Sequence, residues 1–154
     1  MSLVEDYVST RMVSRTSKAS IVEISKAMTD WKISSIAITD EQNRRVIGIL
    51  TERDVVSSIA EGVPPDGINA GSLMSAPVIS IRNDLPIEEA ARVMLKKKVR
   101  HLLVEDAYHG VVGIITTTDL ARYLKQRMER EDTSEGQQNC SSDELVSEVW
   151  ELFF

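Results

Sequence analysis

The chain has 154 residues, of which 42% are hydrophobic and 27% charged, the proportions of an ordinary globular protein. The formal net charge is −6, and residues 129–154 hold eight acids and one base, which leaves +1 for residues 1–128. The chain lacks the basic excess that is typical of nucleic-acid-binding proteins. No apolar run reaches the roughly 18–20 residues that cross a bilayer, and the N-terminus is acidic where a signal peptide is basic. We therefore expect a cytoplasmic protein.

A seven-residue pattern that occurs twice indicates an internal repeat. Residues 48–54 read Gly-Ile-Leu-Thr-Glu-Arg-Asp, and residues 113–119 read Gly-Ile-Ile-Thr-Thr-Thr-Asp. The alignment extends upstream, where Ser9 matches Ser75. It predicts repeat 1 over residues 7–65 and repeat 2 over residues 66–128. A unit of about 60 residues buries little surface alone, so the two are expected to share one core.

The elements of repeat 1 are expected in the order strand, helix, strand, strand, helix. The first strand is Met12–Val13, and Ser20 with Glu23 forms a capping-box pattern before the first helix. Residues 35–38 and 46–50 are too short for helices and rich in branched residues, which favours strands. A second helix is expected to begin at the motif aspartate. The apolar stripes of the two helices comprise Ile21, Ile24, Ala27, Met28 and Trp31, then Val55, Val56 and Ile59.

Repeat 2 shows the same order. A strand at 77–81 precedes a helix with Pro86 in its first turn. Strands at 101–104 and 111–115 follow, and a helix begins at Asp119. The predicted class is α/β (α+β), with two tandem β-α-β-β-α repeats related by pseudo-twofold symmetry and packed sheet to sheet.

The C-terminal region has a different character. Residues 129–140 are polar and acidic, which predicts a flexible linker. Ser141 and Glu144 form a capping-box pattern, and residues 141–154 place apolar side chains opposite acidic ones, which predicts an amphipathic helix. We expect this helix to fold onto its own module or a dimer mate; a docking helix for another protein is the alternative. Its acidic polar face argues against membrane binding.

The two motifs, with Val99-Arg-His-Leu-Leu-Val-Glu-Asp106 and Leu73-Met-Ser-Ala-Pro-Val78, resemble a tandem pair of CBS (cystathionine-beta-synthase-type) domains, a Bateman module. The resemblance covers about four-fifths of the chain. It implies a regulatory homodimer, two modules joined through their helices, that binds AMP, ADP, ATP or S-adenosylmethionine in clefts between the repeats, signals to an unidentified partner and catalyses nothing.

The motif residues suit an adenosine nucleotide. An ionised aspartate accepts two hydroxyl bonds from a ribose diol. Threonine hydroxyls, arginines and helix N-termini suit phosphate, and branched strand residues suit adenine. By resemblance, each site combines the motif of one repeat with strand residues of the other. Site one comprises Ile49, Thr51, Arg53 and Asp54 with Ile79, Arg100, His101 and Leu102. Site two comprises Ile114, Thr116, Thr118 and Asp119 with Val8, Val13, Ser34, Ser35 and Ile36.

Simpler interpretations remain for several of these residues. Asp54 and Asp119 are also typical helix caps, and the motif threonines are also ordinary β-formers. His101 suits a plain strand position. Site one alone contains cations, so it is expected to bind phosphorylated adenosine more tightly than site two.

The expected function is a stand-alone adenosine-nucleotide sensor. The alternative is a protein-interaction adaptor with vestigial clefts that docks through its C-terminal helix. An enzyme is poorly supported, because the sequence shows no nucleophile–base pair and no Walker-type glycine loop. The lone Cys140 has no neighbours at metal-ligand spacing, so neither a metal nor an obligatory cofactor is expected.

Overall fold

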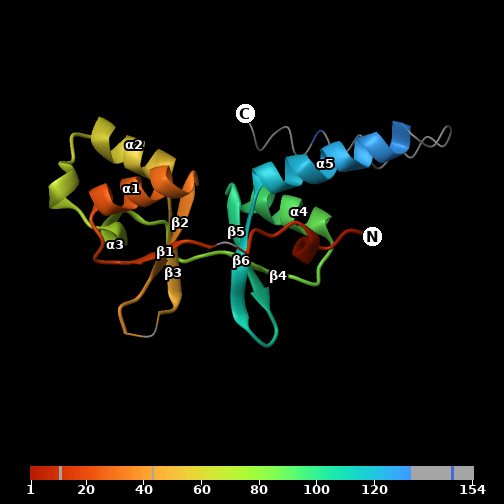
Figure 1. The fold of residues 1–154 in the computed structure, drawn as a ribbon, viewed down its shortest axis with the longest axis horizontal. Helices are drawn as coiled ribbons and strands as arrows, with labels where there is room; N and C mark the ends of the chain where they lie inside the picture. The colour runs from red at the N-terminus through yellow and green to blue at the C-terminus, as the bar shows by residue number, and fades with distance from the viewer. Residues whose placement is uncertain (11, 43, 133–146, 148–154) are drawn as a thin grey trace. The chain divides into compact units, whose positions relative to one another are not determined.

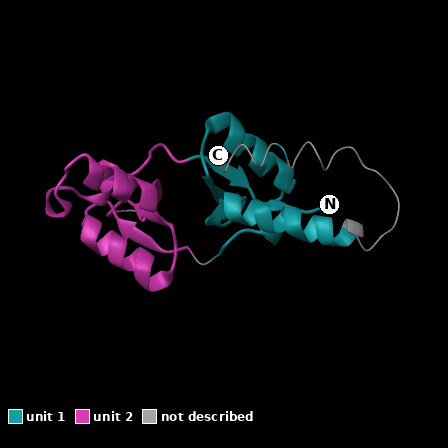
Figure 2. Cartoon of the chain, turned by 90° about the horizontal axis from the view of Figure 1, so that it is seen from above, with its two compact units in different colours: residues 1–10, 79–154 teal, residues 11–78 magenta. Residues whose placement is uncertain are grey.

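A computed structural model describes residues 1–10, 12–42, 44–132 and 147. The chain divides into two compact units, unit 1 with Met1–Thr10 and Ile79–Phe154, and unit 2 with Arg11–Val78 (Figures 1 and 2). Apart from Ser147, the predicted C-terminal helix lies outside the described residues. Within the part of the chain that is described, no helix is both long and apolar enough to cross a membrane.

Unit 2 contains one small sheet in the order β1-β2-β3. Strand β1 pairs with β2 in parallel and β2 with β3 antiparallel, because a helix connects the first two strands and a short loop the second two. The elements are β1 (Ser14–Thr16), α1 (Ile21–Trp31), β2 (Ser35–Thr39), β3 (Val46–Thr51), α2 (Glu52–Ala60), the 3₁₀ turn η2 (Pro65–Gly67) and α3 (Ala70–Leu73).

Unit 1 repeats this topology, with the sheet order β4-β5-β6 and the same parallel and antiparallel pairings. The mixed α/β class predicted from the sequence is confirmed, with two three-stranded sheets and their helices. The elements are the 3₁₀ turn η1 (Val4–Asp6), β4 (Ser80–Arg82), α4 (Ile87–Lys97), β5 (His101–Asp106), β6 (Gly110–Thr116) and α5 (Thr117–Asp132).

Each unit has its own hydrophobic core between its helices and one face of its sheet (Figure 1). In unit 2, Ile24 and Met28 of α1 pack against Ile36 and Leu50 of the sheet. The aligned residues of unit 1 form the other core, which contains Ala90, Met94, Leu102 and Ile115. Burial of these branched and aliphatic side chains is the main favourable term for each unit.

The first residues of each repeat, 7–10 in repeat 1 and 66–78 in repeat 2, form what we call its lead-in segment. Each lead-in segment belongs to the unit that contains the other repeat's sheet. Ser9 bridges β6 through Ile114, with N–O distances of 3.0 and 3.2 Å, and Ser75 bridges β3 through Ile49, with distances of 2.9 and 3.2 Å. The motif glycines, Gly113 and Gly48, allow these crossings. A Cβ at Gly113 would overlap the Ser9 carbonyl, and one at Gly48 would overlap the Met74 side chain.

Several local expectations need correction. The first strands begin later than predicted, at Ser14 and Ser80, although Val13 and Ile79 still accept sheet hydrogen bonds. Both second helices begin two residues before the motif aspartate, because the motif threonine takes the N-cap position. Helix α5 continues to Asp132, so it includes the first four residues of the segment expected to be a linker.

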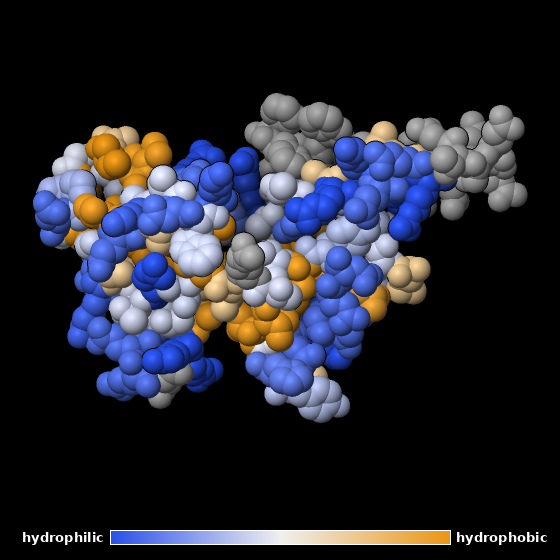
Figure 3. Space-filling view, viewed as in Figure 1, coloured by the Kyte–Doolittle hydropathy of each residue, from blue (hydrophilic) through white to orange (hydrophobic). Residues whose placement is uncertain are grey.

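Three side chains that were assigned to apolar stripes are exposed. Trp31 is 53% exposed, Val56 64% and Ile59 58%. Figure 3 shows hydrophobic side chains gathered over the α1 and α2 region of unit 2. Periodicity identified an apolar helix face correctly, but it does not show whether anything in the same chain covers that face.

The two motif glycines make a matched test of the crossing segments. Gly113→Ala is expected to lower the free energy of unfolding by roughly 1–3 kcal/mol, the range for overpacking a tight site. Gly48→Ala is expected to cost less, because it meets the flexible Met74 side chain rather than backbone. Urea denaturation of both variants measures this. An equal or larger loss for Gly48→Ala would contradict the explanation.

Candidate functional site

The motif of unit 2 is held by reciprocal hydrogen bonds between Thr51 and Asp54. Thr51 N and Oγ1 both donate to Asp54 Oδ2, at 2.8 and 2.9 Å, and Asp54 N donates to Thr51 Oγ1 at 3.3 Å. This is a capping box at the start of α2. It orients the half-buried carboxylate and commits the Thr51 hydroxyl proton to Asp54.

Unit 1 repeats this arrangement at the start of α5. Thr116 N and Oγ1 donate to Asp119 Oδ2 at 2.8 and 2.9 Å, and Asp119 N donates to Thr116 Oγ1 at 3.4 Å. In both units the motif aspartate therefore supports the helix start as the acidic partner of a capping box, while the motif threonine takes the N-cap position. This arrangement leaves the second oxygen of each carboxylate to be accounted for.

The second carboxylate oxygens differ between the units. Asp119 Oδ1 lies 3.3 Å from Arg122 Nη1, and the Asp119 residue is only 5% exposed. Among the described residues, Asp54 Oδ1 makes no hydrogen bond or ion pair. Arg122 is not among the residues predicted from the sequence, although its spacing of three residues from Asp119 on a helix was a visible signal.

The first residues of each middle strand lie beside the motif of their own unit. In unit 2, Ser35 pairs with Thr51, and the Ser34 carbonyl accepts a bond of 3.0 Å from Glu52 N. In unit 1, His101 pairs with Thr116, and the Arg100 carbonyl accepts a bond of 3.1 Å from Thr117 N.

The remaining candidate residues fall into two groups. Buried strand positions are Ile36, Ile49, Leu102 and Ile114; exposed polar positions are Ser34, Arg53, Arg100 and Thr118, and Val8, Val13 and Ile79 are half-buried. Unit 1 brings Val8 next to Gly113 at the end of the crossing segment. The predicted combination of one unit's motif with the other unit's strands stays a prediction.

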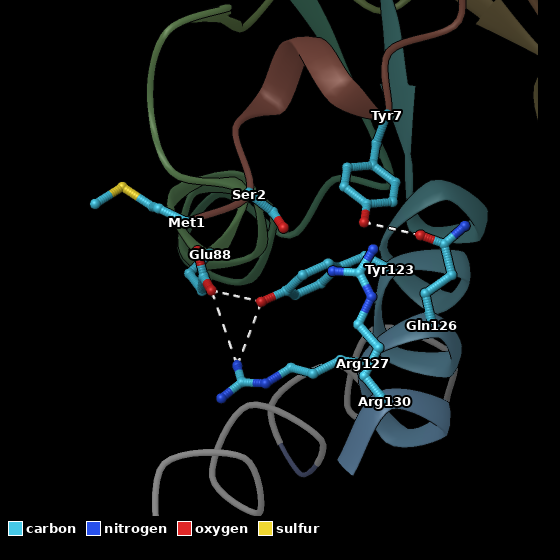
Figure 4. A pocket seen from close by; sticks show the side chains of 8 residues that line it. All are labelled: Met1, Ser2, Tyr7, Glu88, Tyr123, Gln126, Arg127 and Arg130. Carbon is cyan, nitrogen blue, oxygen red and sulfur yellow. Dashed lines mark hydrogen bonds and ion pairs between the residues drawn. The ribbon is translucent and has the colours of Figure 1, made fainter. Parts of the chain in front are cut away.

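A separate cavity of about 300 Å³ lies in unit 1, between the N-terminal segment and helices α4 and α5 (Figure 4). Tyr123 Oη donates to Glu88 Oε1 at 2.7 Å, and Tyr7 Oη donates to Gln126 Oε1 at 2.9 Å. The rings of Tyr7 and Tyr123 meet edge to face, with centroids 5.4 Å apart.

Burial, and then the bond to Glu88, raises the pKa of Tyr123 above its ordinary value. Because the polar groups of this cavity bind one another, we interpret them as the attachment of the N-terminal segment to the helices.

The described residues contain no candidate metal site. Among residues 1–10, 12–42, 44–132 and 147, no group of three His, Cys, Asp or Glu side chains is placed to hold an ion.

Comparison with protein families identifies two matching segments. The family model of the CBS domain matches residues 4–61 and 70–126. Among relatives, the uncharacterized protein MK0525 of Methanopyrus kandleri is 36% identical over 114 residues, which cover 71% of this chain and 58% of the relative. The L-aspartate semialdehyde sulfurtransferase of Methanocaldococcus jannaschii is 30% identical over 79% of this chain, but the match covers only 23% of that enzyme. The chain thus spans only part of both proteins.

Among solved structures, the CBS domain pair of protein MJ0100 in complex with 5′-methylthioadenosine and S-adenosyl-L-methionine is similar to this chain. The TM-score is 0.73 and the sequence identity 28%, over 82% of this chain and 98% of the other. The likeness covers both units described above.

The motif hydrogen bonds generate a stability prediction. Thr51→Val and Thr116→Val are each expected to lower the free energy of unfolding by about 0.5–2 kcal/mol, because each removes an N-cap oxygen. Thr118→Val is the matched control, since its side chain is exposed and takes no part in the capping box. Chemical denaturation of the three variants measures the difference, and equal losses for all three would contradict the capping role.

Proposed function

Because the chain belongs to the CBS domain family, we propose that it is a regulatory module that binds an adenosine-containing ligand and signals its occupancy to a partner protein. The motif threonine and aspartate of each repeat form the centre of each proposed binding site. The module catalyses no reaction. A ligand can shift such a module between two arrangements only through different affinities for them.

The observation that carries this proposal is that Asp54 Oδ1 has no partner among the described residues. The capping box uses Oδ2 and fixes the carboxylate, so Oδ1 is available in a defined orientation. An ionised carboxylate has about four acceptor positions, and the two on Oδ1 match the two hydroxyl donors of a ribose diol. A fixed acceptor also binds without first paying the entropy of ordering a side chain.

The proposed ligand class is defined by the adenosine group that all the candidate ligands share. AMP, ADP and ATP share adenosine with the two ligands of the MJ0100 domain pair, which carry sulfur instead of phosphate. Asp54 would bind the ribose of all of them. Arg53, one residue before it, is exposed and suits phosphate, which favours AMP-like ligands at this site.

Titration calorimetry with AMP tests the proposal. The wild-type protein is expected to bind AMP, and Asp54→Asn is expected to weaken the tighter binding event at least about tenfold, because it removes a charged hydrogen-bond acceptor. Asn keeps an oxygen that can still accept the Thr51 bonds, so the fold is expected to survive.

Asp30→Asn makes the same chemical change at an exposed position of α1 and is expected to bind like the wild type. The proposal fails if neither AMP, adenosine, 5′-methylthioadenosine nor S-adenosylmethionine binds or raises the melting temperature at millimolar concentration. Loss of all binding in Asp119→Asn alone would reverse the assignment of the two sites.

The exposed apolar side chains on α1 and α2 support a homodimer through this face. Val22, Val56 and Ile59 are 54–64% exposed. The residues of unit 1 aligned with Val22 and Val56 are Glu88 and Ala121, so unit 2 has the more apolar helices. Burying such side chains against a second copy would remove apolar surface from water.

A positive charge introduced on this face of α1 and α2 is therefore expected to dissociate the proposed homodimer. In sedimentation analysis, Val56→Lys is expected to shift the protein from dimer to monomer, because an unpaired ammonium group would be buried. Ser57→Lys adds the same charge one residue away and is the control. A monomeric wild-type protein, or a Val56→Lys variant that remains dimeric, would contradict the use of this face.

A further inference from the structure

We propose that Arg122 makes the two binding sites unequal by occupying the carboxylate of the second motif. This inference rests on the proposed function. It concerns which motif binds ribose more readily, and it uses contacts inside unit 1 and inside unit 2 only.

The two aspartates differ in whether a cation already faces the second carboxylate oxygen. At each motif, Oδ2 accepts two bonds from the motif threonine. At Asp54, no described residue bonds Oδ1, so among these residues it keeps both acceptor positions, enough for a ribose diol. At Asp119, Oδ1 already forms an ion pair with the Arg122 guanidinium at 3.3 Å, so a ligand hydroxyl meets an oxygen that a cation already attracts.

Exposure adds to this difference. Asp54 is half-buried, whereas Asp119 is 5% exposed. A ribose that approaches Asp119 must displace Arg122 or share the carboxylate with it. The ion pair therefore competes directly with the ligand.

Among the described residues, this ion pair exists at the motif aspartate of repeat 2 and has no counterpart in repeat 1. The residue of repeat 1 aligned with Arg122 is Ser57, which is exposed on α2 and carries no charge. The duplication thus preserved the motif and changed the residue three positions after it. Arg122 therefore sets the ligand affinity of the second site, and it does so without contacting the ligand.

The size of the effect is modest. The Arg122 side chain is 55% exposed, so solvent screens its attraction to Asp119. Removing an ion pair with one exposed member is expected to change ribose affinity at the second site by about two- to fivefold. The effect should shrink as salt is added, because salt screens the competing pair.

The test measures adenosine binding by calorimetry in an Asp54→Asn background, where the second site dominates. Adenosine is the probe because it lacks phosphate, so Arg122 cannot contribute by binding a phosphate group. Adding Arg122→Ser is expected to tighten adenosine binding two- to fivefold at low salt and less at high salt. Arg122→Gln, which keeps a long polar side chain without charge, should act in the same direction.

The control is Lys125→Ser, which removes a positive charge from the same helix without touching Asp119; Lys125 lies 3.9 Å from Glu129. It should leave adenosine binding unchanged. The reciprocal variant Ser57→Arg, in otherwise wild-type protein, should weaken the first binding event two- to fivefold by giving Asp54 a competing cation.

The outcomes separate the two proposals. If the wild-type protein binds no adenosine compound, the proposed function fails and this inference falls with it. If the wild type binds, but Arg122→Ser leaves adenosine affinity unchanged or weakens it, the inference alone is wrong. A gain for Lys125→Ser equal to that for Arg122→Ser would also overturn it, since general charge would then explain the effect.

Discussion

The hydrogen bonds between the motif threonine and aspartate are the constraint on which the rest of this molecule depends. They end a strand and begin a helix at one residue, so they fix the corner where β3 meets α2 and β6 meets α5. The same bonds fix the direction of a carboxylate at that corner. In unit 2, structure and proposed function share one group, because capping uses one oxygen of Asp54 and the other is the oxygen that we propose binds the ligand.

The corner is supported by the chain that crosses the preceding strand. Ser75 pairs with β3, and Ser9 pairs with β6, in each case beside a glycine that leaves space for the crossing backbone. Each repeat therefore donates its lead-in segment to the unit built around the other repeat. This exchange couples the two units through the covalent chain, and it explains why the glycine and the Thr-x-x-Asp pattern recur together.

The sequence predicted most of the fold, because its signals are local. The two paired strands of each repeat, the Ser20 capping box and the buried part of the helical stripes lie where the sequence predicted them. The predicted boundaries failed at the motif, where the threonine rather than the aspartate caps the helix. Trp31, Val56 and Ile59 were assigned to a buried face and are exposed, because periodicity cannot report what packs on a face.

The candidate site was predictable in its residue types but not in its bonding. The sequence identified Asp54 and Asp119 as equivalent acceptors and placed all cations in site one. The pairing of Asp119 with Arg122 depends on side-chain orientation across one helical turn, which sequence spacing permits but does not require. That pairing also weakens the simple expectation that site two has no cation.

The central claim is that one specific carboxylate oxygen, Asp54 Oδ1, binds the ribose of an adenosine ligand. A crystal structure of the protein with adenosine tests it most directly. The account predicts both ribose hydroxyls within hydrogen-bond distance of Asp54 Oδ1, with the Thr51 bonds intact. Adenosine bound away from Asp54, or bound at Asp119 with Asp54 unoccupied, would contradict it.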